Sequence, residues 1–307
     1  MSAAPGDARG VTAAPEAAPV AALIAGDRRE LIIADRLVAA GYRVRHYGCH
    51  PALAQRAGQP EAASAAAAIA GASLIHCTIP GPNALTGKLY TPYRDADFFL
   101  RAADLDGAAP GAVLFTGSAY EGLREAAAAR GLRNVNLSDD EELMVSNSAA
   151  VAEGALAAII TASEVPLHRA SVVVMGFGKQ AISLCRRLHA LGARVTVVAR
   201  DGAQRARALE MGLEAVPTGA DEPVIRACKF LVYTIPALLL TRERLAWVPP
   251  AALVCVLTAP PGGVDFAAAQ ELGVRLIWPR GLSDTAYRVT AEYQWQAMQR
   301  ALARRLS

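Results

Sequence analysis

The segment with the clearest chemical signature is a glycine-rich turn in the second half of the chain. It reads Gly176-Phe177-Gly178-Lys179-Gln180-Ala181 and fits the pattern G-x-G-x-x-G/A. The pattern alone is weak, but here it follows an apolar, β-branched segment, opens an expected helix and leads to a second expected strand. In that context Gly176 permits a tight turn, Gly178 lets the backbone approach a pyrophosphate, and Ala181 keeps the helix close to the strand. Because a helix N-terminus also offers N–H groups to phosphates, the turn predicts a dinucleotide-binding site.

The residue after the second strand of this unit predicts which dinucleotide is preferred. An acidic side chain there binds the ribose 2′-hydroxyl of NAD, whereas Arg suits the 2′-phosphate of NADP. Arg200 takes this position and favours NADP, while Asp201 directly after it keeps NAD open. The ends of two later strands should also face the cofactor, because ligands of open α/β sheets lie beyond the carboxyl ends of the strands. The expected cofactor-binding residues are Gly176, Phe177, Gly178, Lys179, Gln180, Ala181, Arg200, Thr234, Pro236 and Thr258.

Apolar segments of strand length alternate with helical patterns along the chain. In the first half the expected strands are Val20–Ala25, Arg43–Tyr47, Leu74–Ile79, Ala112–Thr116 and Arg133–Leu137. In the second half they are Ser171–Met175, Arg194–Ala199, Phe230–Tyr233, Leu253–Leu257 and Val274–Trp278. Strands that alternate with helices form mostly parallel sheets covered on both faces. The sequence therefore predicts an α/β fold with two Rossmann-like, doubly wound parallel-sheet domains.

Two further helices are expected to tie the domains together. Asp139 and Glu142 are typical of the N-cap and third positions of a helix, and Asn147 or Ser148 can cap a longer helix to about Ser163. That long helix should join the domains, and a final amphipathic helix should pack back on the first one. The expected parts are a disordered tail, an N-terminal α/β substrate domain, an inter-domain helix and linker, an NAD(P)-binding Rossmann domain and the C-terminal helix, over residues 1–19, 20–145, 146–168, 169–284 and 285–307.

Composition argues against two classes of protein. The 307 residues carry 31 Lys and Arg against 28 Asp and Glu, a net charge of +3, whereas a protein that binds nucleic acid has a strongly basic face. Residues 1–20 lack the basic start and compact apolar stretch of a signal peptide, and no apolar run approaches the roughly 20 residues that span a bilayer. We therefore expect a cytoplasmic protein that neither binds nucleic acid nor inserts into a membrane.

The cysteines and histidines do not form a metal-binding pattern. The five cysteines are scattered, odd in number and never spaced as C-x-x-C, which is typical of reduced structural thiols in a cytosolic protein. His46, Cys49 and His50 lie close together, but no matching pair elsewhere supplies the remaining ligands. We therefore expect a polar loop there and no metal site.

A series of short motifs resembles one known family, the A subunit of bacterial dipicolinate synthase, over nearly the whole chain after residue 20. No single motif is diagnostic, but their order and spacing together are fairly specific. The motifs are Gly26-Asp27-Arg28-Arg29, Asn147-Ser148, Ala152-Glu153-Gly154, Gly176-Phe177-Gly178, Leu191-Gly192-Ala193, Glu210-Met211-Gly212-Leu213, Thr234-Ile235-Pro236 and Pro261-Gly262-Gly263-Val264-Asp265-Phe266.

The resemblance implies oxidation of a dihydrodipicolinate-type ring to pyridine-2,6-dicarboxylate, with NAD(P)+ accepting the hydride. It also implies, as partner, the flavoprotein-like B subunit of dipicolinate synthase, and a place in the cytoplasm of the mother cell of a sporulating bacterium; a homo-oligomer is compatible with it. A ring with two carboxylates calls for Arg forks, helix N-termini and small hydroxyl donors. The candidate substrate-binding residues are Arg28, Ser148, Asn147 and Arg280.

The reaction also requires a group that accepts a proton. Glu153 and Asp265 are the candidate acceptors, and the sequence gives no basis for choosing between them. One segment departs from the family: after the last strand the family has Pro-Gly-Leu-Pro and a later Lys-Thr, but residues 279–287 here lack the second Pro and the Lys. If that segment covers the substrate, its change alters the substrate or removes activity.

Two alternatives remain open. Another two-domain dehydrogenase, of the 2-hydroxyacid or amino-acid type, would need an acid–base His or Lys beside a carboxylate-binding Arg. Only His76, at the end of an expected strand, suits that role. The altered segment at 279–287 also keeps open a non-catalytic protein that senses the nucleotide.

Overall fold

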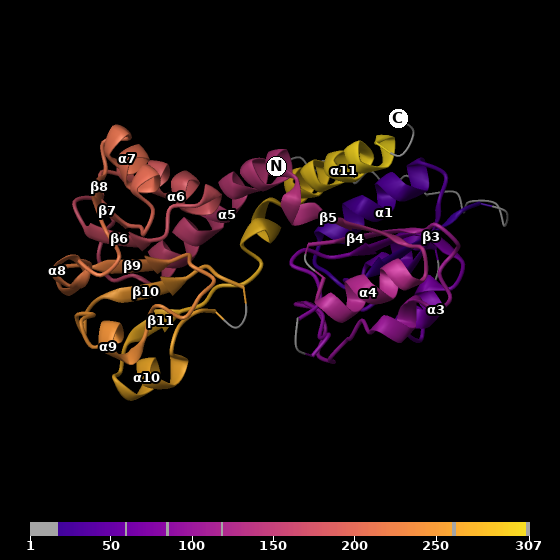
Figure 1. Ribbon diagram of the computed structural model, residues 1–307, viewed down its shortest axis with the longest axis horizontal. Helices are drawn as coiled ribbons and strands as arrows, with labels where there is room; N and C mark the ends of the chain where they lie inside the picture. The colour runs from indigo at the N-terminus through magenta and orange to yellow at the C-terminus, as the bar shows by residue number, and fades with distance from the viewer. Residues whose placement is uncertain (1–17, 59, 84–85, 118, 260–261, 305–307) are drawn as a thin grey trace, which may run out of the picture. The chain divides into compact units, whose positions relative to one another are not determined.

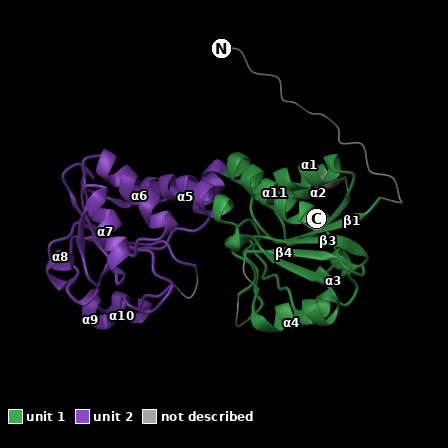
Figure 2. Ribbon diagram, turned by 45° about the horizontal axis from the view of Figure 1, so that its top comes forward, with its two compact units in different colours: residues 1–143, 287–307 green, residues 144–286 purple. Residues whose placement is uncertain are grey.

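A computed structural model describes residues 18–58, 60–83, 86–117, 119–259 and 262–304 (Figure 1). The chain divides into two compact units, coloured separately in Figure 2. Unit 1 comprises Met1–Leu143 together with Tyr287–Ser307, and unit 2 comprises Met144–Ala286. Residues 1–17 of the expected disordered tail lie outside the described residues.

Unit 1 contains a five-stranded sheet in which every neighbouring pair of strands is parallel. Its strands are β1 Val20–Ile24, β2 Arg43–Tyr47, β3 Ala72–Cys77, β4 Val113–Thr116 and β5 Arg133–Asn136. The order β2-β1-β3-β4-β5 is one of the two common orders of doubly wound sheets and reverses direction between β1 and β3. Ligands of such sheets bind beyond the carboxyl ends of the strands at that point, which places the turn after β1 at the expected ligand position.

Helices cover both faces of this sheet because its strands alternate their side chains between two apolar cores. In β1, Ala21 and Leu23 face one core while Ala22 and Ile24 face the other. The helices of the unit are α1 Arg29–Ala39, α2 Leu53–Ala57, α3 Ala65–Ile69, α4 Glu121–Ala129 and α11 Tyr287–Ala303, with 3₁₀ turns η1 Ala102–Leu105 and η2 Leu137–Asp139. Helices α1, α2 and α11 pack on the first face, and α3 and α4 on the second (Figure 2). The C-terminal helix therefore packs back on the first unit, as predicted.

Unit 2 contains a six-stranded parallel sheet with the order β11-β10-β9-β6-β7-β8. Its strands are β6 Ser171–Met175, β7 Arg194–Val198, β8 Glu214–Val216, β9 Phe230–Tyr233, β10 Leu253–Val256 and β11 Arg275–Ile277. Its helices, besides most of α5, are α6 Lys179–Ala190, α7 Gly202–Glu210, α8 Glu222–Arg226, α9 Arg242–Leu245 and α10 Phe266–Glu271, with the 3₁₀ turn η3 Leu282–Ala286. Counted from β6, this is the strand order 3-2-1-4-5-6 of dinucleotide-binding domains. The predicted fold class is confirmed.

The long helix α5, Glu141–Ala162, runs from unit 1 into unit 2 along the chain without a break. Two predictions about its start are wrong. The N-cap is Asp140 rather than Asp139, because the Asp140 carboxylate accepts a hydrogen bond from the Leu143 amide at 2.8 Å and Asp139 ends the preceding 3₁₀ turn. No second helix begins at 147–148, because the Ser148 hydroxyl donates to the Met144 carbonyl one turn back at 2.6 Å and the helix continues through it.

Helix α5 is also long and apolar enough, with a mean hydropathy of 1.6, to cross a membrane by length and composition alone, which was not predicted from the sequence. Ala152, Ala155 and Ile159 on this helix are buried in the core that it forms with α6 and the sheet of unit 2. Core helices of globular domains pass the same test, so its composition alone does not indicate a membrane span.

Candidate functional site

The predicted glycine-rich turn lies at the carboxyl end of β6, where the strand order of unit 2 reverses. Gly176 has φ = 95°, a left-handed conformation that glycine adopts without strain. A side chain there would also collide with Thr234 at the end of the neighbouring β9. The Thr234 hydroxyl donates to the Met175 carbonyl at 2.8 Å, so the two strand ends are fixed to each other. Only glycine fits at position 176.

Gly178 meets a different requirement. It is the N-cap of α6 in an extended conformation, no side chain caps the helix, and a Cβ added at Gly178 would meet nothing within 4 Å. The space next to the helix N-terminus is therefore open for a ligand to approach the backbone. Phe177 and Ala181 instead bury their side chains in the core of unit 2. Of the predicted turn residues, Gly178, Lys179 and Gln180 are the ones that lie on the accessible side.

In the turn after β7, Arg200 and Asp201, the two residues expected to set the preference for NADP or NAD, have different surroundings. The Asp201 carboxylate caps α7 by accepting a hydrogen bond from the Ala203 amide at 2.8 Å. Arg200 is exposed. Its carbonyl and that of Ala199 accept hydrogen bonds from the Arg205 guanidinium at 2.7 and 2.9 Å. The Arg205 guanidinium thus stabilises the loop that carries Arg200, whereas the Asp201 carboxylate stabilises the start of α7.

The predicted contacts at the ends of β9 and β10 differ in accessibility. Pro236 is exposed and Thr234 is half-buried. Thr258 is buried, its hydroxyl donates to the Gly262 carbonyl, and its own carbonyl accepts from the Trp278 indole at 2.8 Å. Thr258 therefore shapes the loop after β10 through its hydrogen bonds.

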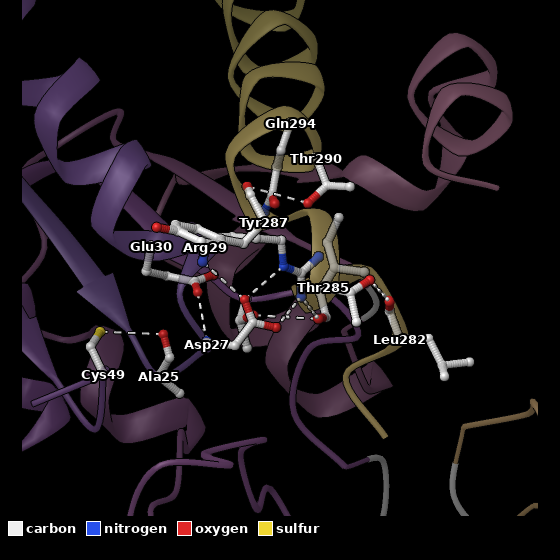
Figure 3. A network of polar contacts seen from close by, with 12 residues as sticks. Ala25, Asp27, Arg29, Glu30, Cys49, Leu282, Thr285, Tyr287, Thr290 and Gln294 are labelled. Carbon is white, nitrogen blue, oxygen red and sulfur yellow. Dashed lines mark hydrogen bonds and ion pairs between the residues drawn. The ribbon is translucent and has the colours of Figure 1, made fainter. Parts of the chain in front are cut away.

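The turn after β1 in unit 1 is built from buried charged side chains (Figure 3). The Glu30 carboxylate accepts the Asp27 amide at 2.7 Å, and the Asp27 carboxylate accepts the Arg29 amide at 3.0 Å. Arg29 returns a two-point ion pair to Asp27 and donates to the Ile79 carbonyl after β3 at 3.0 Å. The amides of Asp27 and Arg29 are therefore not available to a ligand, because neighbouring carboxylates accept hydrogen bonds from both.

Arg28, between these residues, is half-buried. Its guanidinium carbon lies 4.6 Å from the ring centroid of Tyr287, the first residue of α11. This cation–π contact joins the beginning and the end of the chain within unit 1. Tyr287 was not among the residues predicted from the sequence, because no local pattern links it to Arg28.

The other predicted substrate residues lie in unit 2. Ser148 is buried in α5 and Asn147 beside it is half-buried. Arg280 is exposed after β11, with its guanidinium carbon 4.1 Å from the ring centroid of Trp278. Trp278 in turn stacks on Phe266 at 4.5 Å. Arg280 thus lies over an aromatic ring, as Arg28 does.

Both predicted proton acceptors have structural partners. Glu153 is exposed and pairs with Arg187 of α6 at 3.0 Å. The Asp265 carboxylate caps α10 by accepting from the Ala268 amide at 2.9 Å. Their role as acceptors stays a prediction.

His76 in β3 is fully buried, within 3.1 Å of the Gln294 amide nitrogen and 3.6 Å of Glu30. It thus belongs to a polar cluster under the turn after β1 and is closed to solvent. The Cys49 thiol donates to the carbonyl of Leu23 in β1 and to that of Ala25 just after it. The His50 ring packs on Tyr93. Within the described part of the chain, no three His, Cys, Asp or Glu side chains gather in a way that could hold a metal ion.

Known proteins share this two-unit architecture. A putative NAD-binding D-isomer-specific 2-hydroxyacid dehydrogenase from Polaromonas superposes with a TM-score of 0.63 at 13% identity, over 94% of this chain and 97% of that one. At that identity the likeness shows the fold alone, which is the two-domain Rossmann-type fold of such dehydrogenases.

Other proteins are more similar to this chain. Residues 20–138 match the model of the N-terminal domain of the dipicolinate synthase A subunit. The A subunit of dipicolinate synthase from Bacillus subtilis is 29% identical over 196 residues, which cover 64% of this chain and 66% of that protein. The crystal structure of the A subunit of dipicolinate synthase from Bacillus halodurans superposes with a TM-score of 0.78 at 26% identity, over 93% of this chain and 98% of that one. The predicted resemblance to the A subunit of dipicolinate synthase is confirmed: residues 20–138 match the model of its N-terminal domain, and the chain as a whole has the fold of that subunit.

Proposed function

We propose that the chain is an oxidoreductase of the dipicolinate synthase A-subunit type that uses NADP, with NAD as the alternative cofactor. Its proposed reaction oxidises a dihydrodipicolinate-type cyclic dicarboxylate to dipicolinate. The observation that carries the proposal is the open space at Gly178, at the N-terminus of α6 and at the reversal point of a 3-2-1-4-5-6 sheet.

The residues of unit 2 fit a dinucleotide. The uncapped N-terminus of α6 offers backbone donors to a pyrophosphate, and Gly178 leaves room for it. Arg200 would bind the 2′-phosphate, since Asp201 is engaged in capping α7. Thr234 and Pro236 would line the cofactor at the end of β9. When bound, the nicotinamide ring accepts the hydride that the substrate gives up.

Arg28 is the proposed partner of one substrate carboxylate. A guanidinium binds a carboxylate through two parallel N–H donors. The Arg28 guanidinium also lies over the ring of Tyr287. Ser148, Asn147 and Arg280 remain proposed substrate residues. Aromatisation of the ring favours the reaction, so the protein mainly has to position the substrate and accept one proton, for which Glu153 and Asp265 stay candidates.

The biological setting is proposed from the relatives. The matched proteins are named as subunits of dipicolinate synthase, which supports a second protein as partner, proposed to be the flavoprotein-like B subunit. Action in the cytoplasm of a sporulating mother cell follows from the same relationship and is part of the proposal.

Binding of NADP tests the cofactor half. Gly178→Val fills the open space and should abolish binding measured by calorimetry. Gly122→Val, on the exposed side of α4 in unit 1, is the matched control and should bind normally. Equal affinity of wild type and Gly178→Val would reject the nucleotide site.

Turnover tests the substrate half. The purified protein is mixed with dihydrodipicolinate and NADP+, and absorbance of the reduced cofactor and of the aromatic product is followed. NADP binding without turnover, even with the B subunit present, would reject the proposed enzyme activity. It would favour the alternative that the chain is a non-catalytic protein that senses the nucleotide. The full burial of His76 argues against the acid–base histidine that a 2-hydroxyacid or amino-acid dehydrogenase would require.

A further inference from the structure

The backbone on both sides of Arg28 is fixed by buried contacts. Asp27 and Arg29 form a two-point ion pair with side-chain exposures of 0% and 5%. Arg29 also holds the loop after β3 through the Ile79 carbonyl, and Gly26 donates to the Tyr90 carbonyl at 3.2 Å. These contacts hold the backbone of the turn from which the Arg28 side chain extends.

The Arg28 side chain contacts a residue far along the chain. The Tyr287 ring centroid lies 4.6 Å from the Arg28 guanidinium carbon, within the range of cation–π contacts. Arg288 lies over the same ring at 5.4 Å. Arg side chains lose considerable rotamer freedom when they bind, so an arginine already held on a ring binds a carboxylate at lower entropic cost.

Helix α11 is firmly attached to unit 1 and can hold Tyr287 in place. Trp295 and Met298 are buried in the core formed with α1 and the sheet. Gln294 contacts His76 of β3 at 3.1 Å, and Arg300 pairs with Asp140 at 2.7 Å. Tyr287 and Gln294 lie on the side of α11 that faces the polar turn (Figure 3).

We infer that Tyr287 is a positioning residue for Arg28 and that α11 thereby forms part of the substrate-binding site of unit 1. This inference rests on the proposed function, in which Arg28 binds a substrate carboxylate. The ring orients the guanidinium, so its loss should weaken dicarboxylate binding while leaving the cofactor site of unit 2 unchanged. Cation–π contacts of this kind correspond to roughly 3- to 30-fold in a binding constant.

The test measures binding of pyridine-2,6-dicarboxylate to the full chain by calorimetry, in the presence of NADPH. Tyr287→Leu should raise the dissociation constant roughly 3- to 30-fold. Tyr287→Phe keeps the aromatic face and should stay within about twofold of wild type, since the ring quadrupole is retained. Tyr293→Leu, a change of the same type six residues further along α11, is the control for helix stability and should bind normally.

A double-mutant comparison separates positioning from general damage. Arg28→Ala and the Arg28→Ala/Tyr287→Leu double variant should bind the dicarboxylate equally weakly, because the ring acts only through the guanidinium. All variants should bind NADP with wild-type affinity. In a turnover assay Tyr287→Leu should raise KM with little change in kcat.

The outcomes are distinguishable. If Arg28→Ala abolishes binding but Tyr287→Leu matches wild type, or if Tyr287→Phe is as weak as Tyr287→Leu, the inference fails while the proposed function stands. If wild type itself does not bind the dicarboxylate, the proposed function fails. Should Tyr287→Leu unfold, Tyr287→Gln replaces it, and normal binding by a folded Tyr287→Gln would equally overturn the inference.

Discussion

Arg29 and Asp27 form a buried, two-point ion pair at the start of α1, with Nε–Oδ1 and Nη2–Oδ2 distances of 2.8 and 2.9 Å. Burial lowers the pKa of Arg29, but the Asp27 carboxylate, together with Glu30 and Tyr90, raises it by more, so the guanidinium stays charged. Its further bond to the Ile79 carbonyl connects the turn after β1 with the loop after β3. The pair therefore holds together the two strand ends between which the sheet of unit 1 reverses.

Removal of Arg29 should destabilise unit 1 strongly. Arg29→Ala leaves the Asp27 carboxylate buried without its partner, which typically costs about 3–5 kcal/mol in the free energy of unfolding. Urea denaturation followed by circular dichroism measures the change. Arg36→Ala, which breaks an exposed pair with Glu292, is the control and should cost no more than about 1 kcal/mol. A loss as small for Arg29 as for Arg36 would contradict the structural role.

Arg200 should decide the preference between NADP and NAD. Arg200→Asp should weaken NADP binding roughly 10- to 100-fold, because a charge-assisted contact to the 2′-phosphate is lost, and should spare or improve NAD binding. Calorimetry with both nucleotides gives the ratio. Arg186→Asp makes the same charge change at an exposed position of α6 and should leave the ratio unchanged. An unchanged ratio in Arg200→Asp would transfer the role to Lys179, Arg205 or Arg207.

The cysteines should be inert in the folded protein. All five are free thiols, as expected from the sequence, and all five are buried. Burial raises the pKa of Cys185, Cys228 and Cys255 to about 12, and it raises the pKa values of Cys49 and Cys77 as well. Because the thiolate is the reactive form, Ellman's reagent at pH 8 should label essentially none in the native protein and all in denaturant. Rapid labelling of the native protein would contradict the burial of these thiols.

The parts of the fold that the sequence predicted follow from local patterns. The turn at 176–181 could be predicted because strand, glycines and helix are contiguous. Strand β8 was missed because it has three residues and begins with the exposed Glu214. The N-cap at Asp140 was placed one residue early because a 3₁₀ turn precedes the helix, and such a turn has no clear sequence pattern.

The candidate substrate site could be predicted only in part, because its contacts join distant segments. Arg28 is recognisable from its place after the first strand. Its contact with Tyr287 and the contact of His76 with Gln294 arise only when α11 folds back onto unit 1. The hydrogen bonds from the Asp27 and Arg29 amides to the Glu30 and Asp27 carboxylates likewise depend on side-chain directions, which a sequence pattern does not give.

Asp221 provides a test of how the stability of unit 2 depends on pH. Its carboxylate is fully buried and accepts hydrogen bonds from Arg244 at 2.9 Å and from the Gly219 amide at 2.8 Å. Burial raises its pKa, but these bonds and the charge of Arg244 lower it by more, so the net pKa lies below the ordinary value of 3.8.

A pKa that is lower in the folded than in the unfolded state gives stability that is present above the unfolded value and lost as the pH falls through the folded value. Asp221→Asn should therefore lower the free energy of unfolding by about 1–3 kcal/mol at pH 7, and this difference should shrink between about pH 4 and pH 2. Urea denaturation at pH 7, 5, 4 and 3 measures it. Glu222→Gln, which alters an exposed pair with Arg226, should change stability by less than about 0.5 kcal/mol at every pH. A deficit in Asp221→Asn that stayed constant down to pH 3 would mean that shape, rather than the carboxylate charge, is what Arg244 recognises.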